Sequence, residues 1–261
     1  MEKIVEFKNV NFAYNSNAAF NDFSIEIEKG DFVTMIGTSG SGKTTLLKML
    51  CHRLPNAGIY YKGQKVASYK TEDLQKEIVV IFDTPILNKT GLLELKRFIT
   101  KIGLNQEDIA NRIDEFVKTF NMESYINKAI NELTREELYM IKILRYLIIV
   151  PEFLAIDSIL SCVSKANRDK IVAFIKRHEI TCLNVTTDLD DSLYGNKLFV
   201  LENFVLILEG STMSVLKTDT LLKRLGFKLP LAVDLSIELI HYDVLKKIYT
   251  EKEKLVAALW K

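Results

Sequence analysis

The sequence of 261 residues has little of what marks the most specialised protein classes. It has three cysteines, Cys51, Cys162 and Cys182, and none of them lies in a CxxC pair. Such a sparse and odd set predicts reduced thiols in a cytosolic compartment and no zinc site. Only four prolines and 11 glycines are present, which leaves little room for long linkers or low-complexity segments.

The sequence also lacks long apolar runs and an excess of one charge. No run approaches the roughly 18 apolar residues that span a bilayer, and the start lacks the basic and apolar regions of a secretory signal. We therefore expect no direct membrane insertion. Thirty-five Lys and Arg residues oppose 34 Asp and Glu residues, for a net charge of +1. Because phosphate neutralisation needs a basic excess, this balance argues against nucleic acid as a partner.

The apolar patterns predict an α/β fold with a mostly parallel sheet. Residues 4–10 and 23–28 alternate apolar and polar side chains, as half-buried strands of an antiparallel β subdomain would. More apolar strands are expected at 32–36, 78–82, 153–157 and 180–185, separated by helices at 43–53 and 165–178. The strand at 78–82 is entirely apolar, so we expect it to be central and covered on both faces. A hairpin is expected from 198–202 and 204–208, across Glu202-Asn203.

A helical insertion is expected between two core strands. Residues 105–120 place apolar side chains at helical spacing, and a long apolar helix from about 135 to 150 should stop at Pro151. Beyond Gly210 the chain is expected to be helical to its end. We therefore predict one main domain at 1–225, with a helical subdomain at about 86–150, and a C-terminal helical extension at 226–261.

One motif fits G-x-x-x-x-G-K-[ST] at every fixed position, in Gly37-Thr-Ser-Gly-Ser-Gly-Lys43-Thr44. A strand precedes it and a helix follows, as a phosphate-binding loop requires. Backbone N–H groups and the helix N-terminus would bind the phosphates, Lys43 would reach the β- and γ-phosphates, and the Thr44 hydroxyl would join the Mg²⁺ shell. ATP and Mg²⁺ are therefore the expected cofactors. The ATP-binding residues expected from this loop are Gly37, Ser39, Gly40, Ser41, Gly42, Lys43, Thr44 and Thr45.

Asp157 ends the apolar strand Leu154-Ala-Ile-Asp157. A carboxylate there is costly to bury unless it is paired or faces a metal. An Asp that follows a strand is often simply a helix N-cap. Downstream of a phosphate loop the metal role is favoured, in the position called Walker B.

At this point the sequence resembles the ATP-binding subunits of ABC transporters, from about residue 3 to 225. Tyr14 lies where that family stacks adenine on an aromatic ring, and an ordinary strand-edge aromatic is the alternative. Arg145 and Pro151 keep the family's spacing to Asp157 without a gap. Three further segments match the family's glutamine loop, signature and switch histidine by position: Phe82-Asp83, Leu133-Thr-Arg-Glu-Glu137 and Thr186-Thr-Asp188.

The C-terminal segment is similar to that of the energy-coupling factor (ECF) ATPases. Leu229-Pro-Leu-Ala-Val-Asp and the ending Glu253 to Lys261 carry this resemblance, and the tail is similar to a helical dimerisation extension. An amphipathic cap on the fold is the alternative. The resemblance implies a second ATPase subunit, transmembrane T and S components, and a vitamin or metal ion as cargo. It also implies a location on the cytoplasmic face of the cell membrane, through these partners.

The sequence departs from the family where hydrolysis would occur. Ser158 stands at the position of the catalytic glutamate, Thr187 at that of the switch histidine, and Asp83 at that of the glutamine. A hydroxyl cannot act as a general base at pH 7, and losing a positioned base lowers the rate by about 10²- to 10⁴-fold. Asp83 could still approach the metal, so the predicted Mg²⁺ residues are Thr44, Asp157 and Asp83.

The signature-like segment Leu133, Thr134, Arg135, Glu136 and Glu137 has charged residues where the family has Gly-Gly-Gln. A carboxylate about 5 Å from a phosphate oxygen would repel it by roughly 3 kcal/mol at an effective dielectric constant of 20. Arg135 could offset this repulsion or contact phosphate itself. The structural alternative, which we favour, is a capping box that starts a helix with Thr134 and Glu137.

The sequence therefore predicts a subunit that binds Mg·ATP and hydrolyses it poorly, in a heterodimer whose partner supplies the hydrolytic residues. A fully active ATPase with non-standard residues is an alternative. A P-loop kinase would need a lid arginine, for which Arg97 and Arg112 are the candidates, although both are expected on solvated helices. A non-transport ABC protein acting on DNA or translation is disfavoured by the neutral charge.

Overall fold

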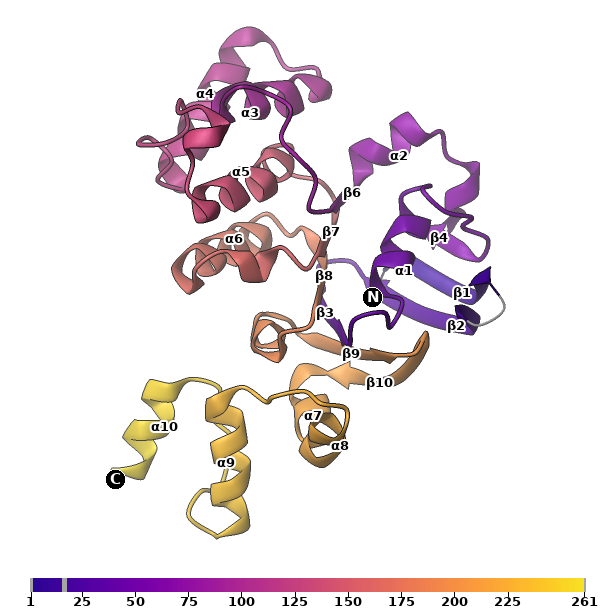
Figure 1. Ribbon diagram of the computed structural model, residues 1–261, viewed down its shortest axis with the longest axis vertical. Helices are drawn as coiled ribbons and strands as arrows, with labels where there is room; N and C mark the ends of the chain where they lie inside the picture. The colour runs from indigo at the N-terminus through magenta and orange to yellow at the C-terminus, as the bar shows by residue number, and fades with distance from the viewer. Residues whose placement is uncertain (1, 16–17, 261) are drawn as a thin grey trace.

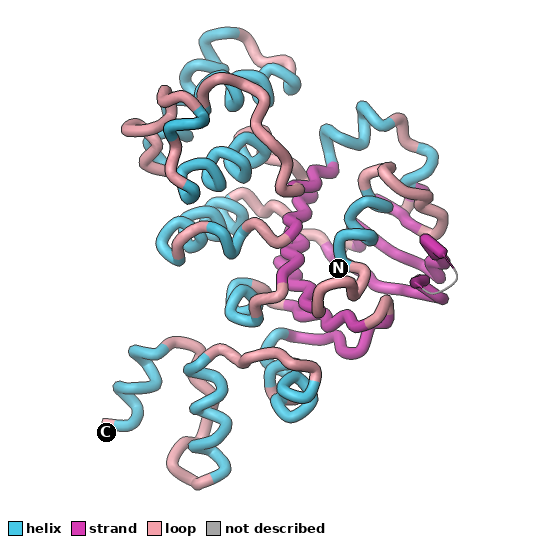
Figure 2. The backbone as a smooth tube through the Cα atoms, in the orientation of Figure 1, coloured by secondary structure: helices cyan, strands magenta, loops and turns pink. Residues whose placement is uncertain are grey.

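The computed structural model describes residues 2–15 and 18–260. A six-stranded sheet crosses its centre in the order β10-β9-β3-β8-β7-β6. Figures 1 and 2 show helices on one side of this sheet and a second, smaller sheet on the other. The central strands are β3 (Phe32–Gly37), β6 (Ile78–Ile81), β7 (Phe153–Asp157), β8 (Thr181–Thr186), β9 (Lys197–Glu202) and β10 (Val205–Ser211).

All neighbouring pairs in this sheet are parallel except β9 and β10, which form an antiparallel hairpin. The mostly parallel sheet predicted from the sequence is therefore confirmed. The prediction that 78–82 is a central strand is wrong, because β6 lies at the edge and pairs only with β7. Both of its faces are nevertheless covered: Val79 and Ile81 pack on the helical side, and Ile78 packs on the other. The strand is therefore entirely apolar because both of its faces are covered, and not because it lies in the middle of the sheet.

The smaller sheet is antiparallel, as expected, in the order β2-β1-β4-β5. Its strands are β1 (Lys3–Asn15), β2 (Ala18–Glu28), β4 (Ile59–Tyr61) and β5 (Gln64–Lys65). Helix α1 (Lys43–Leu50) packs Leu46 and Leu47 into one apolar cluster with residues of both sheets. The phosphate-loop helix is therefore held between two sheets. It ends three residues earlier than predicted, and His52 follows with φ of 61°.

The helical insertion is confirmed as α3 (Gly91–Ile99) and α4 (Gln106–Thr119), followed by α5 (Arg135–Leu147). Helix α6 (Lys165–Arg177) lies beside α5 and covers the same face of the sheet (Figure 1). The predicted apolar side chains of α4 are buried. Ile109, Ile113 and Phe116 belong to the same apolar cluster as buried residues of α3, α5, α6 and the central sheet. Shorter segments are α2 (Thr71–Glu77) and the 3-10 turns Val66–Ser68, Thr100–Ile102, Ile130–Glu132, Leu160–Cys162 and Leu189–Tyr194.

The C-terminal part is helical, as expected, with α7 (Thr212–Leu216), α8 (Asp219–Arg224), α9 (Leu231–His241) and α10 (Lys252–Leu259). Val233 and Ile237 of α9 pack with Ile36 and Val200 of the central sheet in one cluster. Figure 1 shows α9 and α10 projecting from one end of the molecule. Among the described residues, no helix combines the length and apolarity that crossing a bilayer requires.

Candidate functional site

The phosphate loop connects the end of β3 at Gly37 to the first residue of α1, Lys43. Gly42 occupies the N-cap position with φ of 105°, a backbone conformation that side-chain-bearing residues rarely adopt. A Cβ atom there would lie 2.6 Å from Phe20 and 2.7 Å from Phe204. The turn therefore requires glycine for both its backbone angles and its surroundings. Of the other predicted loop residues, Ser39 and Gly40 are exposed, whereas Gly37, Ser41 and Thr45 are buried.

The tip of the β9–β10 hairpin supports this loop from a distant part of the sequence. The backbone N–H of Phe204 donates to the Ser41 carbonyl at 2.9 Å, and its ring packs edge-on against Phe20. Asn203 and Phe204 both have positive φ, 46° and 66°, so the turn lies one residue later than the predicted Glu202-Asn203. We predicted Phe204 as a strand residue and missed its contact with the loop. No local sequence signal connects residues 41 and 204.

Lys43 is buried and turned back onto its own loop. Its Nζ atom donates to the carbonyls of Gly37 at 2.7 Å and Thr38 at 2.8 Å, and to the Ser41 hydroxyl at 3.1 Å. Burial lowers the pKa of Lys43, and the nearby Asp157 carboxylate partly offsets this effect. The structure thus places a desolvated cation at the centre of the loop, where an anion would replace the carbonyl contacts.

Thr44 and Asp157 are brought together as the sequence predicts. The Thr44 hydroxyl donates to Asp157 Oδ2 at 2.9 Å, and these residues come from α1 and the end of β7. A hydroxyl and a carboxylate provide the hard oxygen ligands that Mg²⁺ prefers. The donor set therefore fits Mg²⁺, and a bound ion would neutralise phosphate charge between these two side chains.

Tyr14 lies at the far end of β1, beside the start of α1. Its hydroxyl accepts a hydrogen bond from Thr45 at 3.3 Å, and its ring contacts Phe12 edge-on. The residue is 53% exposed, so it is accessible to solvent beside the start of the phosphate-loop helix. This position is compatible with the predicted adenine-stacking role.

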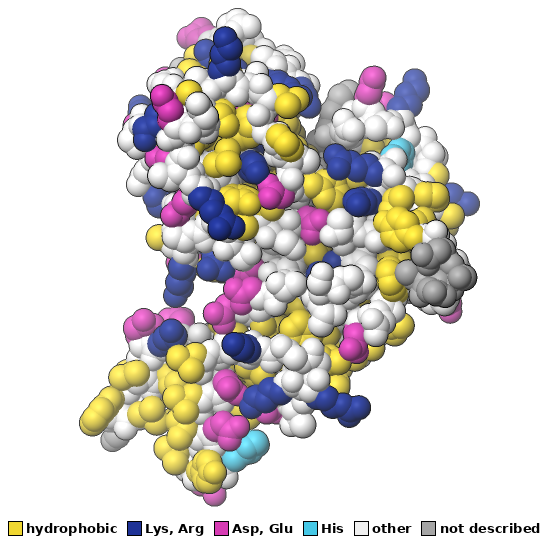
Figure 3. Space-filling model, in the orientation of Figure 1, with side chains coloured by type: hydrophobic (Ala, Val, Ile, Leu, Met, Phe, Trp, Pro, Cys, Tyr) yellow, Lys and Arg dark blue, Asp and Glu magenta, His cyan; other side chains and the backbone are white. Residues whose placement is uncertain are grey.

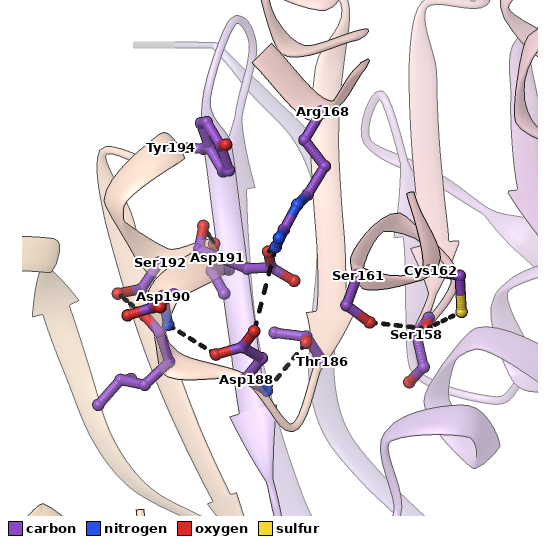
Figure 4. Close-up of polar contacts among 12 residues, drawn as sticks. Ser158, Ser161, Cys162, Arg168, Thr186, Asp188, Asp190, Asp191, Ser192 and Tyr194 are labelled. Carbon is purple, nitrogen blue, oxygen red and sulfur yellow. Dashed lines mark hydrogen bonds and ion pairs between the residues drawn. The ribbon is translucent and has the colours of Figure 1, made fainter. Parts of the chain in front are cut away.

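Ser158 begins a tight loop at the carboxyl end of β7. It has φ of 59°, its N–H donates to the Val185 carbonyl at 2.8 Å, and its own carbonyl accepts from Ser161 Oγ at 3.3 Å. Figure 4 shows Ser161 and Cys162 converging on Ser158. The Ser158 hydroxyl lies 3.4 Å from Asp157 Oδ1, so the side chain beside the candidate metal ligand is a hydroxyl, which cannot act as a general base at pH 7.

The segment after β8 carries Thr187 as an exposed side chain. Two aspartates that follow Thr187, Asp188 and Asp191, connect this segment to Arg168 of α6. Arg168 Nη1 lies 2.6 Å from Asp191 Oδ1 and 4.0 Å from Asp188 Oδ2 (Figure 4). Asp191 is fully buried, and burial raises its pKa although Arg168 opposes that shift. Sequence reasoning missed both Arg168 and Asp191, because nothing near either residue in the chain predicts their pairing.

Asp83 is not directed at the Thr44–Asp157 pair. Its Oδ2 accepts from the Tyr139 hydroxyl at 3.0 Å, and its Oδ1 is bound by Lys142 Nζ. The hydrogen bond from Lys142, followed by that from Tyr139, lowers the pKa of Asp83 below its ordinary value despite some burial. In this structure the residue that we predicted as a third Mg²⁺ ligand is therefore bound to α5.

The signature-like segment forms the start of α5, and the favoured capping-box interpretation is confirmed. Thr134 Oγ1 accepts from the Glu137 N–H at 3.2 Å, while Glu137 Oε2 accepts from the Thr134 N–H at 2.8 Å. Leu133 packs against the helical core, and Arg135 lies over the Tyr139 ring, 5.8 Å from its centroid. The segment is thus a stable helix start with an exposed arginine.

Glu136 makes a contact that the sequence does not reveal. Its Oε1 accepts from the Ser164 N–H at 3.0 Å and from Asn167 Nδ2 at 2.7 Å. Ser164 is the N-cap residue of α6. The hydrogen bonds from Ser164 and Asn167 lower the pKa of Glu136. The carboxylate expected to repel phosphate is instead used within the chain to join α5 to α6.

A buried ion pair supports α5 from behind. Arg145 Nη1 lies 2.7 Å from Glu94 Oε1, and both side chains are at most 3% exposed. Arg145 Nη2 also donates to Thr84 at 2.8 Å. The sequence shows that Arg145 keeps the family's spacing to Asp157, but it does not reveal the pairing of Arg145 with Glu94.

The two arginines considered for a kinase lid lie on different helices. Arg97 is exposed on α3, and Arg112 is half-buried on α4.

Comparison with known proteins identifies the family of this chain. The family model described as ABC transporter matches residues 20–161, more than half of the chain. The energy-coupling factor transporter ATP-binding protein EcfA1 of Staphylococcus aureus (strain USA300) is 24% identical over 251 residues, 91% of this chain and 93% of that protein. The protein of the same name from Mycoplasmopsis synoviae (strain 53) is 23% identical over 262 residues, 96% and 97% of the two chains.

Solved structures confirm the fold. The chain superposes with a TM-score of 0.75 on cbiO1 from Clostridium perfringens, part of the ABC transporter complex cbiONQ, at 18% identity over 92% of this chain and 100% of that one. It superposes with a TM-score of 0.71 on one chain of the dimeric structure of the ATP-binding cassette MJ0796 bound to ADP and Pi, at 24% identity over 80% of this chain and 99% of that one. With its phosphate loop, Thr44–Asp157 pair and two-sheet architecture, the chain belongs to the ABC transporter family, as an ATP-binding domain.

Proposed function

We propose that this chain is the ATP-binding subunit of an ECF-type importer for a micronutrient, a vitamin or a metal ion. It binds Mg·ATP at the phosphate loop and couples closure of an ATPase dimer to transmembrane T and S components. Its place is the cytoplasmic face of the cell membrane, through these partners. The names of its relatives and the similarity of its C-terminal segment support this assignment.

The observation that carries the proposal is the contrast between the two halves of the site. The binding half is complete, since Lys43 lies within the loop and Thr44 contacts Asp157 at 2.9 Å. In the hydrolytic half, Ser158 offers a hydroxyl beside Asp157, and Thr187 offers a second hydroxyl. Neither can accept a proton from water at pH 7. The chain therefore binds nucleotide well and hydrolyses it slowly alone.

A second, different ATPase chain follows from this contrast. A homodimer would hold two sites that both lack a base, whereas a heterodimer can take the hydrolytic residues from its partner. The division into 1–225 and a dimerising extension at 226–261 is part of the proposal. Exposed apolar side chains of the extension support it: Leu231, Leu235, Tyr242, Val244, Val256, Leu259 and Trp260. Figure 3 shows hydrophobic side chains gathered at this end of the molecule.

The test measures nucleotide binding and ATP turnover of the purified chain alone. We expect saturable Mg·ATP binding that Lys43→Ala abolishes, together with little turnover. Robust turnover that Lys43→Ala removes would instead establish a fully active ATPase with non-standard residues. ATP-dependent phosphorylation of a metabolite would overturn the proposal in favour of a kinase.

The partner is tested by purifying the chain from its native membrane and identifying the proteins that come with it. We expect a second ATP-binding chain and integral membrane proteins. Recovery of a self-paired complex alone would contradict the heterodimer.

A further inference from the structure

Asp83 leaves the edge strand next to the candidate metal ligand. Ile81 of β6 is paired with Ile156 of β7, so Asp83 follows its strand at the same edge of the sheet as Asp157 and Ser158. Neighbouring strands lie about 4.8 Å apart. From this place the Asp83 carboxylate can turn toward Asp157 or toward α5. The structure shows the second arrangement, with both carboxylate oxygens taken by α5.

Lys142 accounts for this choice. The residue is 8% exposed and has buried apolar neighbours, Ile141 and Ile143, on both sides in the sequence. A buried ammonium group requires a partner, and the Asp83 carboxylate is that partner. The Tyr139 ring lies 4.8 Å from the same Nζ atom, and its hydroxyl donates to the second oxygen of Asp83. Two residues of the same helix, α5, therefore hold the two carboxylate oxygens of Asp83.

The geometry points to Lys142 as a latch that holds Asp83 on α5 and keeps its carboxylate away from Mg²⁺. Without the latch, two carboxylates, Asp83 and Asp157, would both be available to the same cation at one sheet edge. With it, Asp157 alone contacts Thr44. Lys142 is thus a positioning residue that sets the number of carboxylates available to the metal. This inference rests on the proposed Mg·ATP site.

The charges around Asp83 favour the latched arrangement. Lys142 is the closest cation, Tyr139 adds a hydrogen bond, and Arg135 contributes a more distant attraction. Asp83 itself is 49% exposed, while the Lys142 side chain is 11% exposed. Asp83 can therefore move without opening the core, whereas Lys142 cannot follow it. Release of the latch means movement of the loop after β6, not of α5.

The first experiment uses the nucleotide-free chain. Unfolding by urea is compared for the wild type, Lys142→Met, Asp83→Asn and the double variant. Methionine keeps the length and packing of the lysine stem but not its charge. We expect the two substitutions to be coupled, by about threefold or more in the unfolding equilibrium constant. Additive effects would overturn the latch, whether or not the chain binds nucleotide.

The second experiment titrates Mg²⁺ in the presence of a non-hydrolysable ATP analogue and measures nucleotide binding. We expect Lys142→Met to lower the half-saturating Mg²⁺ concentration at least about fivefold, since a second carboxylate becomes available. Lys142→Arg, which keeps the charge, should stay near the wild type, and Lys142→Met with Asp83→Asn should return to it. An unchanged Mg²⁺ requirement in Lys142→Met, or a lowered one that survives Asp83→Asn, would overturn the latch.

The two experiments separate this inference from the proposed function. If the wild type binds no nucleotide, the proposed function fails, and the coupling of Asp83 to Lys142 in the nucleotide-free chain still decides whether the latch exists. If the wild type binds Mg·ATP and Lys43→Ala removes that binding, the proposed function stands, and the response of Lys142→Met decides the latch alone.

Discussion

Glu136 of α5 accepts the backbone N–H of Ser164 at 3.0 Å, so a residue of one helix caps the start of another. In an ordinary capping box the third residue of the same helix supplies this carboxylate. In α6 that residue is Asn167, which donates to Glu136 instead. The altered signature and the loop that starts at Ser158 are thereby fixed to each other.

Glu136→Ala should destabilise the chain by about 0.5–2 kcal/mol, the usual effect of losing a helix N-cap. It should also increase amide hydrogen exchange at 158–168, because the cap anchors the end of that loop. Urea unfolding and hydrogen exchange measure the two effects. Glu115→Ala, on the exposed face of α4, is the matched control and should change stability by less than about 0.5 kcal/mol. Equal effects of the two substitutions would contradict the cap.

Acid should remove this stabilisation. Hydrogen bonds hold the pKa of Glu136 below its ordinary value of 4.5. A carboxyl group whose folded pKa is lowered stabilises the fold above its unfolded pKa, and this contribution is lost as pH falls through the folded pKa. Stability should therefore decrease below pH 4.5. Glu136→Gln should reduce the slope of stability against pH in that range. An unchanged slope in this variant would show that other groups carry the acid sensitivity.

Much of the fold could be predicted because it depends on local pattern. The phosphate loop and the capping box of Thr134 and Glu137 each involve residues close in sequence, and both are found. The helix expected to stop at Pro151 already ends at Leu147. The place of β6 could not be predicted. An apolar run indicates that both faces of a strand are covered. It does not indicate whether the strand has a neighbour on one side or on both sides in the sheet.

The phosphate loop offers a comparison of two glycines. Gly42→Ala should abolish or strongly weaken nucleotide binding, because a methyl group would meet the rings of Phe20 and Phe204 at 2.6–2.7 Å. Gly40→Ala is the control, since its Cβ meets no atom within 4 Å although φ is also positive, at 82°. It should show only the backbone cost of about 1 kcal/mol. Binding titrations and unfolding of both variants test this, and similar losses in the two would contradict the steric explanation.

The buried ion pair behind α5 should be sensitive to removal of one partner. Glu94→Ala leaves Arg145 buried without its carboxylate and should cost about 3–5 kcal/mol. Glu94→Gln, which keeps a hydrogen-bond acceptor, should cost less. Arg97→Ala serves as control: the Arg97 side chain is 48% exposed and lies 3.7 Å from Glu94 Oε2, so its removal should cost under about 1 kcal/mol. Chemical denaturation ranks the three variants, and a cost for Glu94→Ala no larger than that of the control would refute the assignment.

The parts of the site that sequence reasoning missed are contacts between segments far apart in the chain. Asp83 with Lys142, Glu94 with Arg145, and Arg168 with Asp191 are separated by 59, 51 and 23 positions. Each charged residue alone looks like a solvated surface group. Only the packing of α3, α5 and α6 on one face of the sheet brings them together, and no periodicity encodes such pairs.

The strand order has a consequence for synthesis of the chain. The phosphate loop follows β3, whose two neighbours, β8 and β9, are made about 150 residues later. Phe204, which donates to Ser41, comes later still. A nascent chain that has released residues 1–150 from the ribosome therefore holds the whole G-x-x-x-x-G-K-T motif with an unpaired β3. Its nucleotide site is completed only when the hairpin tip emerges, so ATP can stabilise this domain only near the end of its translation.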